Sequence, residues 1–184
     1  FEPAMRLPLL ELCFPALRQL SFEQYKLFSA NLDTLIRADG RIGISEWAVR
    51  KLIDKHLGEA FEGRHSSPKY KKLELLKPQC EILLSLLAYC DRQSGITPEQ
   101  AFAAGKSELE LDITLQDKSE LGFKKLDEAL DKLANLHPLR KPKILKACIK
   151  TVTADELVSI TESELLRTIA SSLECPMPPI MPTS

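Results

Sequence analysis

Apolar residues recur every three or four positions along most of the chain, which is the spacing of one face of an α-helix. The pattern is clearest from Phe22 to Ile36, from Leu121 to Leu136 and from Ile144 to Val152. Runs that alternate between apolar and polar residues, typical of strands, end after a few positions, and no Asn-Gly hairpin signal occurs. The sequence therefore predicts an all-α fold, a single bundle of about seven to nine helices.

Short polar motifs mark where several of these helices begin. Capping boxes, in which a Ser or Thr is followed three positions later by Glu or Gln, start at Ser21, Thr97 and Thr161. Ser45 is predicted to cap a further helix whose buried face includes Trp47, Leu52, Ile53 and His56 or Leu57. The polar segment from Gly58 to Lys72 is predicted as a long exposed loop. We place one helical domain at residues 1–174 and a proline-rich tail at residues 175–184.

A nine-residue phrase occurs twice in the chain, at Ala38 to Glu46 and again 116 positions later at Ala154 to Glu162. A third, weaker copy lies at Cys90 to Glu99. In each copy the Asp is placed to close one helix, and the Glu lies in the first turn of the next, where the helix dipole favours a negative charge. The apolar residues between them, Ile42 with Ile44 and Val158 with Ile160, are expected to anchor the loop in the core. The phrase predicts a repeated helix-loop-helix unit.

The acids of the repeated phrase are also the best candidates for a metal site. A divalent cation would be bound by Asp39 with Glu46, or by Asp155 with Glu156 and Glu162. An EF-hand is excluded, because its twelve-residue loop needs oxygen ligands at alternate positions, whereas Asp39 and Glu46 are seven positions apart with few oxygen ligands between them. Every residue of the phrase also has a structural role without a ligand, which is the interpretation that we favour.

Composition and net charge limit the classes of function that the chain can have. Apolar residues make up 44% of the 184 positions and charged residues 28%, as in an ordinary soluble globular protein, and the net charge of −1 gives no general attraction for nucleic acid. Five cysteines without a C-x-x-C pair favour a reducing compartment and small buried side chains over a disulfide framework. Basic residues gather at Lys69 to Lys72 and along Arg140 to Lys150, which we interpret as solvated surfaces.

Catalytic motifs are absent from the sequence: it has no H-E-x-x-H, no G-x-S-x-G and no phosphate-binding glycine loop. We therefore expect the chain not to be an enzyme and to need no cofactor other than the cation considered above. No apolar run reaches the roughly 18 residues that a membrane-spanning helix needs.

The turn Ala38-Asp39-Gly40-Arg41-Ile42 followed by Glu46 resembles the TerB-like helical domain. Several segments, taken in order, are also similar to the C-terminal region of bacterial membrane zinc peptidases of the HtpX kind: Leu7-Pro8-Leu9-Leu10, Pro15-Ala16-Leu17-Arg18, Glu46-Trp47, Glu164-Leu165-Leu166-Arg167 and Cys175-Pro176-Met177-Pro178-Pro179. The resemblance implies a non-catalytic helical domain on the cytoplasmic face of the bacterial inner membrane. Glu156 replaces the glycine usual in the family turn, so the resemblance gives the second copy no cation role.

The expected function is that of a regulatory or protein-interaction domain of such a peptidase. Its partner would be another protein or the upstream peptidase part of the same chain, with the membrane reached only through that part and no nucleic acid bound. Met177, Ile180 and Met181 of the tail are candidate contacts for a groove on a neighbour, and a disordered tail is the alternative. The second hypothesis for function is a divalent-cation sensor.

Overall fold

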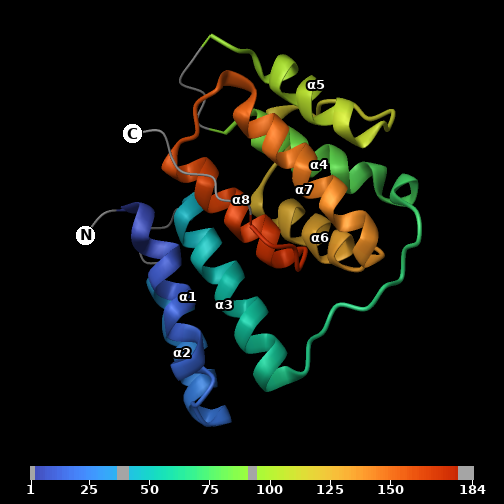
Figure 1. The fold of residues 1–184 in the computed structure, drawn as a ribbon. Coiled ribbons are helices and arrows are strands. Elements are labelled where there is room, and N and C mark those ends of the chain that lie inside the picture. The colour runs from blue at the N-terminus through green and yellow to red at the C-terminus, as the bar shows by residue number, and fades with distance from the viewer. Residues whose placement is uncertain (1–2, 37–41, 91–94, 178–184) are drawn as a thin grey trace. The chain divides into compact units, whose positions relative to one another are not determined.

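The computed structural model describes residues 3–36, 42–90 and 95–177, and in this part of the chain it contains eight α-helices (Figure 1). They are α1 (Arg6–Leu17), α2 (Phe22–Ile36), α3 (Ile44–Glu62), α4 (Lys77–Ala88), α5 (Pro98–Leu109), α6 (Phe123–Ala134), α7 (Lys141–Val152) and α8 (Ile160–Ser172). The described residues form no strand, only an isolated bridge between Tyr70 and Leu136. The prediction of an all-α chain with seven to nine helices is confirmed.

The internal contacts divide the chain into two compact units, Phe1–His65 and Ser66–Ser184. The first unit holds α1 to α3 and the second holds α4 to α8. The boundary that we place at residue 174 stays a prediction.

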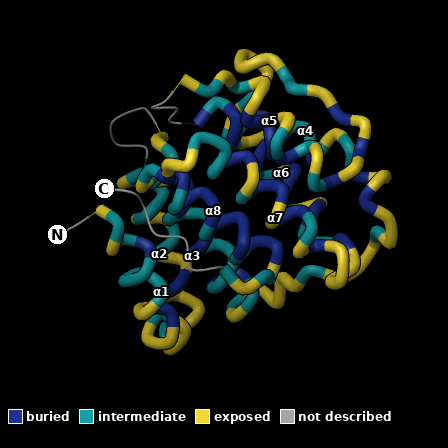
Figure 2. The backbone as a smooth tube through the Cα atoms, turned by 45° about the horizontal axis from the view of Figure 1, so that its top comes forward, coloured by how far each residue is buried: buried dark blue, intermediate teal, exposed yellow. Residues whose placement is uncertain are grey.

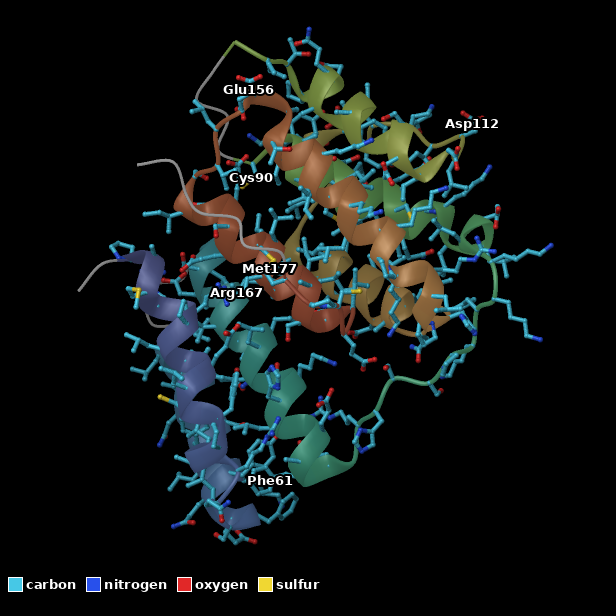
Figure 3. The ribbon with its side chains drawn as sticks, in the orientation of Figure 1. Phe61, Cys90, Asp112, Glu156, Arg167 and Met177 are labelled. Atoms are coloured by element: carbon cyan, nitrogen blue, oxygen red, sulfur yellow. The ribbon has the colours of Figure 1, made fainter. Side chains whose placement is uncertain are left out.

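In the first unit, α1 and α2 both pack against α3. The Tyr25 hydroxyl of α2 donates a hydrogen bond to the Glu62 carboxylate at 2.7 Å, and the Tyr25 ring stacks on that of Phe61 with centroids 4.6 Å apart. Figure 3 shows Phe61 near the C-terminal end of α3. The Arg50 guanidinium of α3 lies 3.1 Å from the Asp33 carboxylate of α2. The predicted inner face of α3 is confirmed, because its large apolar side chains are buried at Trp47, Leu52, Ile53 and Leu57.

In the second unit, α7 packs against three of the other four helices. It packs on α4, α5 and α8, while α6 packs on α4 and α8. Figure 2 shows buried backbone along α7 and α8 and more exposed backbone along α5. The predicted inner face of α7 is buried at Ile144, Leu145, Cys148 and Val152, whereas Ile149 is half-buried.

The polar loop after α3 begins later than the sequence predicts. Gly58 is buried inside α3, and the helix continues to Glu62. It ends at Gly63, whose φ of +64° is the left-handed conformation that glycine adopts without strain. The prediction placed the helix end at the first glycine, but only the second has the terminating conformation.

Candidate functional site

Three of the predicted cation ligands, Glu46, Asp155 and Glu162, lie at the starts or ends of helices. Glu46 is the third residue of α3, and its carboxylate accepts the backbone N–H of Gly43. Glu162 is the third residue of α8, and its carboxylate accepts the backbone N–H of Ser159 at 2.9 Å. Asp155 accepts the backbone N–H of Leu157 at 3.2 Å in the turn between α7 and α8. Asp39 lies outside the described residues.

The described ends of the first two copies therefore share one structural feature, in which a glutamate accepts the backbone N–H of the residue that precedes its helix. This confirms the predicted place of Glu46 and Glu162 in a first helical turn. The caps themselves lie two residues earlier than predicted, at Gly43 and Ser159 instead of Ser45 and Thr161. The Ser159 hydroxyl accepts the backbone N–H of Glu162 at 3.1 Å, so this pair satisfies two helix-end donors at once.

The expected apolar anchors of these loops are only partly correct. Val158 is buried, as predicted, but Ile42 and Ile160 are exposed and Ile44 is half-buried. Ile42 precedes the cap of α3 and Ile160 is the first residue of α8, so neither lies on the buried face of a helix.

Glu46 belongs to the first compact unit, and Asp155 and Glu162 to the second. Figure 3 shows Glu156 in the turn that joins α7 to α8. Its φ of +62° is the left-handed conformation, which residues other than glycine adopt uncommonly. Among the described residues, no group of three or more His, Cys, Asp and Glu side chains is arranged to hold a metal ion. The cation-sensor hypothesis stays a prediction.

The proline-rich tail is described only as far as Met177. This side chain is half-buried and follows the end of α8, as Figure 3 shows. Ile180 and Met181, the other two predicted contacts, lie outside the described residues. The role of the tail in partner binding stays a prediction.

Two of the four lysines of α7 are paired with acids near the C-terminal end of α5. Lys143 lies 2.5 Å from the Glu110 carboxylate, and Lys150 lies 2.7 Å from that of Glu108. Asp112, just beyond α5 in Figure 3, pairs with Lys106 of the same helix. Because α5 and α7 pack together, these acids offset much of the positive charge that the sequence places on α7.

Burial makes several of the cysteines unsuited to nucleophilic chemistry. Cys80, Cys90 and Cys148 are buried, and all five thiols are free. Burial raises the pKa of Cys80 to about 12 and also raises the pKa of Cys148 and Cys175. Thiols with raised pKa values stay protonated and do not attack. The predicted role of most cysteines as small buried side chains is confirmed for Cys80, Cys90 and Cys148.

A surface that the sequence analysis did not identify lies on α1 and α2. Large apolar side chains here face water, with exposed fractions of 76% for Leu12 and 73% for Leu35, and Met5, Phe22 and Leu27 are also exposed. Of the twelve residues of α1 only Leu7 and Phe14 are buried. One feature of the sequence could have predicted this surface: α1 is apolar on every side, which is unusual for a helix with one side facing water.

His56 lies where α1 meets α3. Its ring is 4.2 Å from that of Phe14, and its Nδ1 is 3.4 Å from the Arg18 guanidinium. Burial lowers the pKa of His56 below its ordinary 6.5, Arg18 and Lys55 lower it further, and Glu59 and Glu11 raise it. The folded chain therefore favours the neutral ring.

We expect the first unit to become less stable in mild acid. Because the pKa of His56 is lower in the folded chain, its contribution to stability is complete above pH 6.5 and is lost as the pH falls through 6.5 toward the folded pKa. The fluorescence of Trp47, the single tryptophan, reports urea unfolding at pH 7.5 and 5.5. The variant His56→Gln should show a smaller loss between these two pH values, and an equal loss in both proteins would contradict the assignment.

No helix within the described residues combines the length and apolarity needed to cross a bilayer. Comparison with protein-family models, with curated proteins and with solved structures gives no match.

Proposed function

We propose that the chain is a helical protein-interaction domain that binds an apolar helical segment of a partner protein through α1 and α2. The observation that carries the proposal is the set of large apolar side chains exposed on these two helices and on the turn before them: Met5, Leu12, Phe22, Leu27 and Leu35. We refer to these five residues as the apolar surface.

The spacing of the apolar surface suits a helical ligand. Leu27 and Leu35 are eight positions apart in α2, with Asn31 midway between them, so they lie on one stripe of that helix. α1 adds Leu12 on a second helix of the same unit. An amphipathic helix binds by laying its apolar face on exposed apolar residues of this kind.

Charge favours a protein over a polyanion as the ligand. α1 and α2 carry two positive side chains, Arg6 and Lys26, against three negative ones, Glu11, Glu23 and Asp33. A surface with nearly balanced charge has no attraction for phosphate groups, so binding must come from apolar burial. Transfer of one exposed leucine from water into an interface contributes about 1.5–3 kcal/mol.

The resemblance to the C-terminal region of HtpX-type peptidases supports a more specific form of the proposal. In this form the ligand is a segment of a zinc peptidase that precedes this domain in the same polypeptide. The domain itself is non-catalytic and regulates or positions the peptidase at the cytoplasmic face of the inner membrane.

A selection of helical peptides on the full chain tests the general proposal. We expect selected peptides to carry apolar residues at helical spacing and to bind with micromolar dissociation constants. The triple variant Leu12→Asp/Leu27→Asp/Leu35→Asp should lower their affinity at least tenfold, because three charges would be buried on binding. The control variant is Leu139→Asp, since Leu139 is an equally exposed leucine of the second unit.

Circular dichroism of the triple variant verifies its fold, which exposed positions should leave intact. Equal binding to the triple variant and to wild type, or a selection that yields no binder, would overturn the proposed surface. The specific form has its own test in the reading frame upstream of Phe1. An H-E-x-x-H motif with apolar spans there would support the peptidase, and a start codon next to Phe1 would overturn that form alone.

A further inference from the structure

A second surface lies in the second unit, where two short segments of the chain run side by side. The backbone N–H of Lys69 donates to the Asn135 carbonyl at 2.7 Å, and that of His137 donates to the Tyr70 carbonyl at 2.9 Å. These bonds surround the isolated parallel bridge between Tyr70 and Leu136. Because the pairing is parallel, both segments leave the bridge in the same direction. The first leads into α4, and the second joins α6 to α7 (Figure 1).

We call residues 69–77 and 137–140 together the basic turn surface. Its positive side chains are Lys69, Lys71, Lys72, Lys77 and Arg140, and its single acid is Glu74. All of the cations are exposed except Lys77, which is half-buried. Within the described residues none of the five makes an ion pair, unlike Lys143 and Lys150 of α7. The structure therefore leaves a concentrated positive charge on this surface, although the whole chain has a net charge of −1.

Two leucines protrude among these cations. Leu75 lies in the 3-10 turn Leu73–Leu76, and 63% of its surface is exposed, while Leu73 and Leu76 in the same turn are buried. Leu139 lies in the turn Pro138–Arg140, and 83% of its surface is exposed. Each turn is thus fixed to the fold and presents one leucine to water.

We propose that the basic turn surface binds the surface of an anionic membrane. The lysines and Arg140 attract the lipid headgroups, and Leu75 and Leu139 enter the boundary between headgroups and acyl chains. This proposal concerns the second unit, so it does not depend on the apolar surface of α1 and α2. It extends the expectation from the sequence, in which only an upstream region reaches the membrane.

The exposed leucines favour a membrane over the other polyanions. Nucleic acid would neutralise the cations but would give the leucines no apolar contact. An acidic protein would need pockets shaped to receive two protruding side chains, whereas a fluid bilayer accepts them without a matching shape. The mixture of unpaired cations and isolated leucines on short turns therefore matches a lipid surface best.

Co-sedimentation of the full chain with vesicles tests the proposal. We expect binding to phosphatidylcholine vesicles that contain 30% phosphatidylglycerol in 50 mM salt, and at least tenfold weaker binding in 500 mM salt or to pure phosphatidylcholine. The variant Lys71→Glu/Lys72→Glu should weaken binding at least tenfold. The variant Leu139→Asn should weaken it severalfold while retaining the salt dependence.

The matched control is Lys118→Glu/Lys124→Glu, which changes the net charge equally. Both lysines are exposed: Lys124 lies in the first turn of α6 and Lys118 in the 3-10 turn before it, whereas Asn135 follows the other end of this helix, which is about 18 Å long. Equal weakening by the two pairs of substitutions would overturn the proposal, and so would equal binding to neutral and anionic vesicles. Binding of an acidic leucine-containing peptide without any binding to vesicles would also overturn it and would assign the surface to a protein partner.

Discussion

Replacing Gly105 with alanine should lower the free energy of unfolding by about 3 kcal/mol, the upper part of the range for overpacked cores. Gly105 is buried in α5, where this helix lies against α7. A Cβ atom at this position would lie 2.0 Å from the Thr151 hydroxyl and 2.9 Å from the Ala147 carbonyl oxygen. The hydroxyl cannot move away freely, because it donates a hydrogen bond to that same carbonyl at 3.0 Å. The two helices would therefore have to separate.

Urea unfolding followed by far-UV circular dichroism measures this loss. The control is Gly122→Ala at the N-cap of α6, where a Cβ atom meets nothing within 4 Å, and its cost should stay below about 1 kcal/mol. The double variant Gly105→Ala/Thr151→Ala should recover part of the stability, because it removes the shorter clash and leaves the carbonyl. A Gly105→Ala protein that unfolds at the wild-type urea concentration would show that α5 and α7 are not closely packed.

The sequence predicted the helices well because their signals are local. The capping box from Thr97 to Gln100 forms as expected, with the Thr97 N–H donating to the Gln100 side chain at 2.9 Å. Ser21 and Gln24 form a similar pair. These motifs span one helical turn, and the apolar spacing that follows them decides which face is buried. Neither signal needs information from distant parts of the chain.

The start of α8 shows where local signals become ambiguous. Two capping boxes overlap here, Ser159 to Glu162 and Thr161 to Glu164. From the sequence we predicted that the second one starts the helix. The structure uses the first, with Val158 buried before the helix and Glu164 inside it. Either capping box can satisfy the free backbone N–H groups at the start of the helix. Tertiary packing therefore decides which of the two residues becomes the cap.

The charge and exposure of the surfaces could not be predicted from the sequence, because they depend on contacts between residues far apart in the chain. The acids that neutralise α7 come from Glu108 and Glu110, more than thirty positions away. The basic turn surface exists because Tyr70 pairs with Leu136. The exposed leucines of α1 and α2 have the same helical spacing as buried ones, so the pattern alone could not separate them from the core.

Removing the charge of Glu174 should destabilise the chain more than replacing its partner Lys141. The Lys141 side chain is only 4% exposed, and its ammonium lies 3.0 Å from the Glu174 carboxylate, which is 42% exposed. Glu174 also accepts a hydrogen bond from the Ser66 hydroxyl. In Glu174→Gln the buried ammonium would lose its counter-charge, at a cost of about 2 kcal/mol, below the range for fully buried pairs because Glu174 is partly solvated.

The variant Lys141→Met should cost less than about 1 kcal/mol, because methionine retains an apolar stem in the buried position and removes the charge that needs a partner. In the Lys141→Met background, Glu174→Gln should then have almost no effect, since the remaining carboxylate can be hydrated. Urea unfolding of the two single variants and the double variant gives the coupling energy directly. Equal losses of stability in the two single variants, with no coupling energy, would contradict this prediction. The pair would then behave as a solvated surface contact, and the buried Lys141 ammonium would not need a neighbouring negative charge.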